Sequence, residues 1–366
     1  MKLNFIDLKQ QYIKYKAEID QGIADVVNST QFIMGPKVSE LERLLADYAG
    51  VKHGIGVSSG TDALLLALMA YGVKSGDEII CPPFTFIATA EVIALLGAKP
   101  VFVDVDEKTY NMNPLLIEEN INERTKGIIT VSLYGQVADM DEISTIAERQ
   151  GIFVIEDGCQ SFGATYKGRK SCGLSDIGTT SFFPSKPLGC YGDGGMVFTD
   201  NEEKAGIIRS LLSHGQEKRY EHKLIGINGR LDALQAAVLI AKFRHFDEEV
   251  KLRGIKASYY NEGLKDFVVT PYVEDHNTSV YAQYSIRTAR RNELSKFLND
   301  NNVPTAIHYP MSLHLQEAFK YLGYSAGDFP VSEKVSQEIL SLPMFPFITQ
   351  DEQDYVIGKV QEFFKK

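Results

Sequence analysis

The sequence has 366 residues, of which 44% are hydrophobic and 23% are charged. This composition is ordinary for a globular protein, and the length favours two domains. The formal net charge is −10 without a compensating basic run, which argues against nucleic acid as a partner. No stretch approaches about 18 uncharged apolar residues, so we predict no membrane span. The four cysteines include no C-x-x-C pair, and the N-terminus lacks an apolar signal core, which together predict a cytoplasmic protein.

The first half of the chain alternates between short apolar strands and amphipathic helices. It begins with helices at 8–29 and 38–48, and Gly50 ends the second. A short strand and turn is predicted at 53–59, and strands at 78–82, 100–105, 127–131, 153–157, 179–183 and 195–199. Helices are predicted between them at 60–71, 85–96, 114–121 and 140–150. Continuous apolar strands between such helices predict an α/β fold, with a large and mostly parallel sheet covered by helices.

The second half of the chain is predicted to leave this sheet. A long, mostly helical run at 230–262 forms a bridge, after which a strand at 281–287 mixes with further helices. These helices are predicted at 292–301, 332–340 and 351–364. We therefore predict a large α/β domain over residues 13–245 and a smaller C-terminal α+β domain over residues 246–366. Residues 1–12 are expected to pack near the second domain.

Three features follow predicted strand ends, where open α/β sheets place their ligands. Gly60 and Thr61 open a helix, whose free N–H groups can bind a phosphate. Asp157 ends an apolar strand, where a carboxylate needs a cationic or hydrogen-bonding partner. Lys186 lies between a strand end and a glycine-rich turn, where desolvation would lower its pKa and make the neutral amine a nucleophile. Each feature alone has a structural explanation, as a helix cap, a turn carboxylate and a surface lysine.

Together the three features fit one cofactor, pyridoxal 5′-phosphate. Its phosphate would bind at Gly60 and Thr61, its protonated ring nitrogen would face Asp157, and Lys186 would capture its aldehyde as a Schiff base. Phe86 follows a strand end and either stacks on the cofactor ring or is a core aromatic residue. No motif predicts a metal site.

The motifs around these residues resemble the DegT/DnrJ/EryC1/StrS sugar aminotransferases, which are fold-type I pyridoxal-phosphate enzymes. The resemblance covers essentially the whole chain, through motifs at 58–64, 83–89, 103–106, 155–161, 181–186, 192–195, 228–232 and 341–343. It implies that Lys186 and Asp157 are catalytic. It also implies cofactor contacts from Gly60, Thr61 and Ser181 at the phosphate, Phe86 on the ring face, Asp157 at the ring nitrogen, Gln160 at the ring hydroxyl and Lys186 at the aldehyde.

The same resemblance implies a partner subunit and a reaction. Asn228 would reach the phosphate of the neighbouring subunit's cofactor, so the enzyme would be an obligate homodimer with shared active sites. Lys186 is retained where some relatives have histidine and are dehydratases, so transamination is expected. L-Glutamate would convert the cofactor to pyridoxamine 5′-phosphate and leave as 2-oxoglutarate, and a nucleotide-linked keto sugar would then receive the amino group. Cys159, which follows Asp157 where the family often has alanine or histidine, is expected to be a packing residue.

The nature of the sugar rests on motifs at 132–136, 183–195, 279–284 and 308–310. They are more similar to members that aminate C3 of UDP-2-acetamido-2-deoxy-3-keto-D-glucuronate, for O-antigen synthesis. The uronate carboxylate needs a local cation, for which Arg230 and His308 with Tyr309 are candidates. Met34 is a candidate for the sugar pocket.

Other interpretations stay open at this point. Arg230 could instead be structural or bind the diphosphate, and His308 and Met34 could be an ordinary turn residue and a core residue. The alternative substrates are another UDP- or dTDP-keto sugar aminated at C4, or a deoxysugar aminated at C3. A distant alternative is a pyridoxal-phosphate-binding regulator without catalytic activity.

Overall fold

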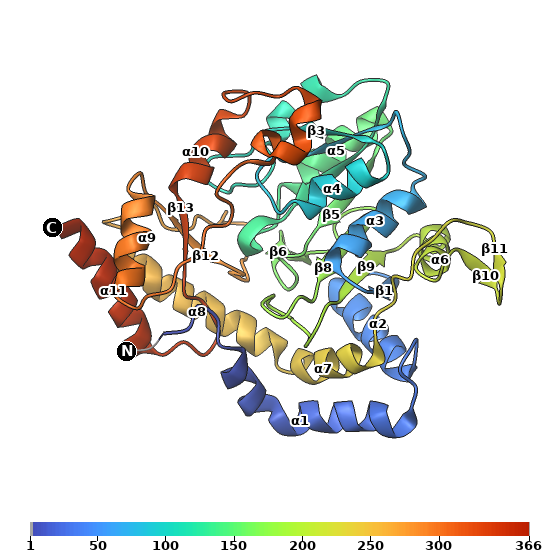
Figure 1. The fold of residues 1–366 in the computed structure, drawn as a ribbon, viewed down its shortest axis with the longest axis horizontal. Coiled ribbons are helices and arrows are strands. Elements are labelled where there is room, and N and C mark those ends of the chain that lie inside the picture. Colours follow the sequence, from blue (N-terminus) through green and yellow to red (C-terminus); the bar gives the residue numbers. More distant parts are fainter. Residues whose placement is uncertain (1–2, 366) are drawn as a thin grey trace.

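A seven-stranded sheet forms the centre of the structure, which is a computed structural model that describes residues 3–365 (Figure 1). The strand order is β1 (His53–Val57), β9 (Gly195–Thr199), β8 (Ile177–Ser181), β5 (Phe153–Asp157), β4 (Thr125–Val131), β2 (Glu78–Cys81) and β3 (Lys99–Phe102). Only β9 runs against its neighbours, and the other pairs are parallel. The predicted α/β fold with a mostly parallel sheet is therefore confirmed.

Helices cover both faces of this sheet, because successive residues of each buried strand point to opposite sides. On one face, Ile129 and Ile155 pack with α3 (Gly60–Ala70), α4 (Ala88–Leu95) and α6 (Glu202–Leu211). On the other face, Ile128 and Val154 pack with α5 (Met140–Gln150). Farther along that face, α2 (Pro36–Ala49) and α7 (Ala233–Phe243) cover β9. The sheet therefore exposes only its strand ends, where the candidate site residues lie.

The long helical run predicted at 230–262 is broken into two helices, α7 and α8 (Phe246–Leu264). The break falls at His245, whose backbone leaves the helical region. The His245 ring stacks on Tyr15 of α1 (Leu8–Ser29) at 4.2 Å and lies 2.7 Å from the Glu18 carboxylate. Tertiary contacts with α1 thus fix the bend, and these cannot be read from the local helical pattern.

A second cluster forms around a two-stranded antiparallel sheet, β12 (Tyr284–Arg287) with β13 (Ile339–Leu342). α8, α9 (Arg291–Asp300) and α11 (Gln350–Lys365) pack on it, together with Leu3 near the N-terminus. The segment around Phe319 and Phe329 instead packs beside β3 on the large sheet. The C-terminal half of the chain therefore contacts both clusters.

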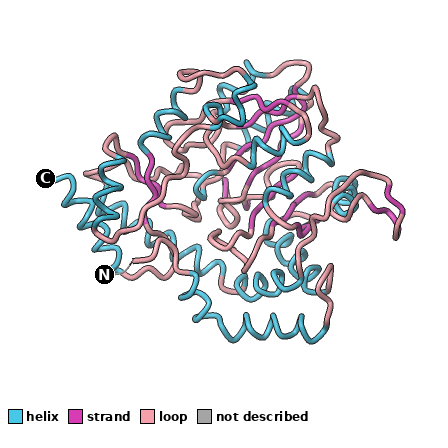
Figure 2. Tube along the Cα trace, viewed as in Figure 1, coloured by secondary structure: helices cyan, strands magenta, loops and turns pink. Residues whose placement is uncertain are grey.

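Several predicted elements differ from the observed ones (Figure 2). The helix predicted at 85–96 begins only at Ala88, and the helix predicted at 114–121 consists of two short 3₁₀ turns. The strand predicted at 281–287 begins at Tyr284, and the helix predicted at 332–340 ends at Glu338, before β13. α6 was not predicted, although Asn201 caps it through the Lys204 N–H at 3.0 Å. Also unpredicted are the hairpin β10 (Gln216–Lys218) with β11 (Glu221–His222), and the short pair β6 (Thr165–Tyr166) with β7 (Arg169–Lys170).

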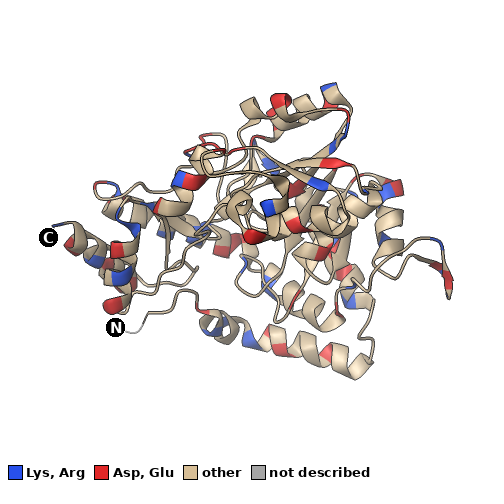
Figure 3. Cartoon of the chain, turned by 45° about the horizontal axis from the view of Figure 1, so that its top comes forward, with Lys and Arg blue, Asp and Glu red and all other residues tan. Residues whose placement is uncertain are grey.

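Charged side chains of both signs are interspersed along helices such as α1 and α11 (Figure 3). Within residues 3–365, no helix is both long and apolar enough to cross a membrane.

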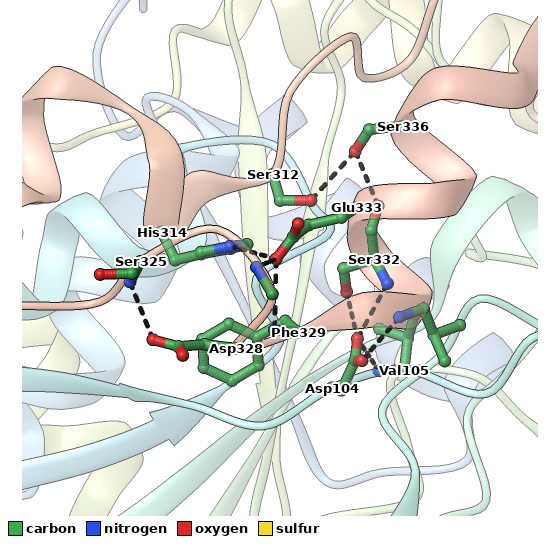
Figure 4. Close-up of polar contacts among 12 residues, drawn as sticks. Asp104, Val105, Ser312, His314, Ser325, Asp328, Phe329, Ser332, Glu333 and Ser336 are labelled. Carbon is green, nitrogen blue, oxygen red and sulfur yellow. Dashed lines mark hydrogen bonds and ion pairs between the residues drawn. The ribbon is translucent and has the colours of Figure 1, made fainter.

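A carboxylate from the edge of the large sheet caps α10 (Pro330–Glu338) (Figure 4). Asp104, which follows β3 and is 6% exposed, accepts hydrogen bonds from the N–H groups of Val331 at 2.9 Å and Ser332 at 3.0 Å. Beside this cap, Glu333 lies 3.0 Å from the His314 ring and accepts the Gly327 N–H at 2.8 Å. These contacts attach α10, and through it β13, to the large sheet.

We expect Asp104→Ala to lower the free energy of unfolding by about 1–2 kcal/mol, because the first N–H groups of α10 lose their acceptor. Urea unfolding followed by circular dichroism measures this loss. The matched control is Asp328→Ala, whose exposed carboxylate accepts the Ser325 N–H at 2.8 Å in a surface turn. It should change stability by less than about 0.5 kcal/mol. Equal losses in the two variants would contradict the capping role.

Candidate active site

The start of α3 forms a cradle at the carboxyl edge of the large sheet. Ser59 caps the helix by accepting the Asp62 N–H at 3.0 Å, whereas no acceptor among residues 3–365 bonds the N–H groups of Gly60 and Thr61. A Cβ atom on Gly60 would lie 2.7 Å from the Ser181 Cβ and 2.8 Å from the Cys159 Sγ. Only glycine fits this approach. The free N–H groups and the positive end of the helix dipole make the cradle suitable for a phosphate.

Asp157 ends β5 beside this cradle, is 6% exposed, and is held by hydrogen bonds at both carboxylate oxygens. The Thr89 hydroxyl donates to Oδ2 at 2.8 Å, and the Cys159 N–H donates to Oδ1 at 3.2 Å. Thr89 is itself 3.2 Å from the Thr85 hydroxyl. The sequence does not single out Thr89, because its contact with Asp157 spans 68 residues. Its only sequence signal was its place in the motif at 83–89.

Lys186 lies in the loop between β8 and β9. The Lys186 N–H donates to the Phe183 carbonyl at 2.8 Å, and the Cys190 N–H donates to the Phe182 carbonyl at 2.8 Å, so the loop is compact. Burial lowers the pKa of Lys186, while the Cys159 thiol and the Asp157 carboxylate act in the opposite direction. Lys186 and Asp157 thus share one electrostatic environment. Desolvation favours the neutral form of the Lys186 amine more than it does in a surface lysine.

Gln160 connects the loop after β5 to a segment from the C-terminal half. Its Oε1 accepts the Tyr134 N–H at 2.9 Å, and its Nε2 donates to the Tyr309 hydroxyl at 3.3 Å. Burial, with the Asp157 carboxylate, raises the pKa of Tyr309, so the phenol keeps its proton. The Phe86 ring lies 6.2 Å from the Tyr309 ring and is 53% exposed, whereas nearby Phe84 is buried. The core-aromatic explanation therefore applies to Phe84, and Phe86 is free to stack on a ligand.

His308 lies next to Tyr309 and close enough to Lys186 to be influenced by its charge. Burial lowers the pKa of His308, and the Lys186 cation lowers it further. Its Nδ1 is 2.9 Å from the Ser341 hydroxyl in β13. His308 is therefore neutral at neutral pH. It can form a hydrogen bond with a ligand, but it cannot act as the cation that pairs with a carboxylate.

Arg230 lies on the rim of the cradle. Its backbone pairs with Val57 at the end of β1, and the Ser58 N–H donates to the Gly229 carbonyl at 2.9 Å. The Arg230 Nε is buried without an acceptor among residues 3–365. A buried guanidinium nitrogen without an acceptor is costly, so it favours an anionic ligand at this position.

Met34 and Asn228 lie farther out than Arg230. Met34 is 44% exposed in a loop that pairs with the chain next to Arg230, through Ile33 and Asp232. Asn228 is exposed, and its backbone pairs with Ser213. No hydrogen bond or ring contact within residues 3–365 joins Met34 or Asn228 to the Lys186 loop. Both residues are therefore exposed in a single chain.

We expect Lys186 to react with an aldehyde at lower pH than a surface lysine. A lowered pKa leaves more neutral amine at any pH below the usual lysine pKa. The labelling rate of Lys186 therefore reaches half its plateau at a lower pH. Lys16 is the control, because its hydrogen bond to Asp20 raises its pKa. Reductive methylation of dialysed protein from pH 7 to 10, followed by peptide mass spectrometry, measures both profiles. A Lys186 midpoint at or above that of Lys16 would contradict the desolvation argument.

Comparison with known proteins identifies the family. The sequence model of the DegT/DnrJ/EryC1/StrS aminotransferase family matches residues 14–361. The UDP-2-acetamido-2-deoxy-3-oxo-D-glucuronate aminotransferase of Pseudomonas aeruginosa is 51% identical over 347 residues, covering 94% of this chain and 96% of that protein. A pleiotropic regulatory protein of Geobacillus stearothermophilus is 46% identical over 369 residues, covering 100% and 99%. The structure of NtdA from Bacillus subtilis with bound cofactor PMP has a TM-score of 0.92 at 30% identity, covering 100% of this chain and 86% of that chain. The chain therefore belongs to the DegT/DnrJ/EryC1/StrS aminotransferase family.

Proposed function

We propose that this protein is a pyridoxal-phosphate-dependent aminotransferase that transfers the amino group of L-glutamate to C3 of UDP-2-acetamido-2-deoxy-3-oxo-D-glucuronate. The observation that carries the proposal is the meeting of a phosphate cradle, a fixed carboxylate and a desolvated lysine at one edge of the sheet. Gly60, Asp157 and Lys186 supply these three features.

The residues present fit pyridoxal 5′-phosphate, which supplies an electron sink for the reaction when bound. Thr61 and Ser181 would hold its phosphate together with Gly60, where a side chain would fill the space. Gln160 would reach the ring hydroxyl, and Phe86 would cover one ring face. The PMP-bound structure of NtdA supports this cofactor for the family.

Lys186 would capture the cofactor aldehyde and then move the proton during transamination. Its pKa, lowered by burial, lets the neutral amine act as a general base and the resulting ammonium act as a general acid. Asp157 would face the ring nitrogen, in an orientation fixed by Thr89 and the Cys159 N–H. Burial, with the Asp157 carboxylate, raises the pKa of the Cys159 thiol well above its usual value, so Cys159 stays protonated and packs against the cradle.

The substrate assignment rests on the Pseudomonas relative and on Arg230. A uronate carries a carboxylate that needs a cation, and we assign this role to Arg230, whose buried Nε has no acceptor within residues 3–365. Because His308 is neutral, it would bind the sugar as a hydrogen-bonding group beside Tyr309, and not as the counter-ion considered from the sequence. Met34 would line the outer sugar pocket.

We also propose a homodimer with shared active sites. The chain that leads to Asn228 exposes large apolar side chains, Tyr220 at 77% and Ile225 at 90%. Exposed apolar side chains of this size favour a protein partner. Asn228, which follows this exposed segment, would then reach the cofactor phosphate of the partner subunit. The enzyme would act in the cytoplasm, and its amino sugar would serve O-antigen or related lipopolysaccharide synthesis, as the resemblance implies.

Incubation with L-glutamate and either 3-keto or 4-keto UDP sugars tests the assignment. We expect NMR to place the new amine at C3, with 2-oxoglutarate as the co-product, and Lys186→Ala to abolish both products. Amine formed only at C4 would overturn the substrate assignment and favour a C4 aminotransferase. Absence of any transamination by cofactor-loaded protein would favour a regulatory function, which the name of the Geobacillus relative suggests for that protein.

We expect Arg230→Gln to lower kcat/KM for the uronate by at least about 30-fold, which corresponds to about 2 kcal/mol for a charge pair that loses one partner. The same 3-keto sugar with a neutral hydroxymethyl group should change by less than about threefold, since it has no carboxylate to pair. Arg230→Lys is the matched control, because it keeps the charge but loses the bidentate geometry. Equal losses with both sugars would show that Arg230 binds a common part of the substrate or is structural.

A further inference from the structure

A second desolvated lysine contacts the loop that carries Lys186. Lys242, in α7, is 3% exposed, and its Nζ donates a hydrogen bond to the Gly189 carbonyl. No carboxylate among residues 3–365 lies within 4.0 Å of this ammonium group. A buried ammonium without an ion pair is costly, so the hydrogen bond between Lys242 and the Gly189 carbonyl has a structural or functional purpose.

The carbonyl that Lys242 binds belongs to Gly189, whose backbone lies close to an earlier part of the same loop. A Cβ atom on Gly189 would lie 2.5 Å from the Pro184 carbonyl oxygen and 2.7 Å from that of Phe183. The Phe183 carbonyl also accepts the Lys186 N–H at 2.8 Å. The backbone that precedes Lys186, at Phe183 and Pro184, is therefore packed against Gly189, which follows Lys186 in the same loop. A shift of Gly189 would move the turn from which the Lys186 side chain extends.

We propose that Lys242 is a positioning residue for transamination, which holds the loop at residues 182–190 so that Lys186 is aimed into the active site. This proposal rests on the proposed function, in which Lys186 carries the cofactor and the proton.

The surroundings of Lys242 maintain this contact. Burial lowers its pKa to about 8, whereas the Glu249 carboxylate and the Cys190 thiol raise it and the Arg253 cation lowers it. Glu249 is itself fixed by the Gln11 side-chain amide at 2.8 and 2.9 Å. A protonated Lys242 makes a charge-assisted hydrogen bond, which is stronger than one from a neutral donor.

Lys242→Met tests the proposal, since it keeps a long apolar side chain but removes the donor. With cofactor saturation checked by its visible absorbance, we expect kcat to fall by about tenfold or more, because small displacements of a catalytic group have large effects on rate. KM for both substrates should stay within about twofold. Lys242→Arg, which retains a donor, should restore at least half of kcat.

The matched control is Lys204→Met. Lys204, in α6, donates to the Ala70 carbonyl at 2.9 Å and lies 4.4 Å from the Tyr71 ring centre, but it is not part of the loop. It should leave kcat unchanged. A wild-type kcat in Lys242→Met, or equal losses of kcat in both variants, would overturn the proposal. If Lys242→Met does not fold, Lys242→Leu, which also lacks a donor, replaces it, and a wild-type kcat in Lys242→Leu overturns the proposal.

Lys186→Ala separates this proposal from the proposed function. If the absorbance of bound pyridoxal 5′-phosphate at its lysine adduct persists in Lys186→Ala, the role of Lys186 fails, and the proposed function fails with it. If the adduct is lost in Lys186→Ala while Lys242→Met keeps the wild-type kcat, only the role of Lys242 fails.

Discussion

The desolvation of an amino group next to a carboxylate is the constraint on which this site depends. Lys186 gains reactivity from burial, which lowers its pKa, yet the Asp157 carboxylate beside it favours the charged form. For the pKa of Lys186 to stay lowered, Asp157 must stay fixed and must not form a tight ion pair with Lys186. Hydrogen bonds from Thr89 and the Cys159 backbone occupy the Asp157 oxygens and so preserve this separation.

One side of the candidate site is formed by His308 and Tyr309, which lie more than 100 residues after Lys186 in the sequence. His308 and Tyr309 are held by Ser341 in β13 and by Gln160 in the large sheet domain. Because α10 directly precedes β13, its cap by Asp104 also fixes the position of this side of the site. The geometry of the site therefore depends on contacts that lie outside it, and weakening the cap is expected to affect this side of the site as well as stability.

The sheet, most helices and the meeting of Gly60, Asp157 and Lys186 at one sheet edge could be predicted from the sequence, because they follow from local periodicity and from motifs at strand ends. The properties that decide the chemistry of the site could not be predicted from the sequence. The neutral state of His308 depends on burial and on Lys186, and the contact of Thr89 with Asp157 joins separate elements. Lys242 begins a charged stretch of sequence that suggests a solvated helix face, yet it is buried because α7 packs beneath the loop.

Lys186 and Lys242 are two desolvated lysines at a single loop, for which we propose two different purposes. Both lose hydration, and burial lowers the pKa of each. Lys242 keeps a hydrogen-bond acceptor, the Gly189 carbonyl, and the attraction of Glu249, so its amine is occupied. No hydrogen bond among residues 3–365 occupies the Lys186 amine, and the Cys159 thiol and the Asp157 carboxylate are close enough to raise its pKa. We therefore propose that the same desolvation gives a positioning residue where an acceptor is present and a nucleophile where no acceptor occupies the amine.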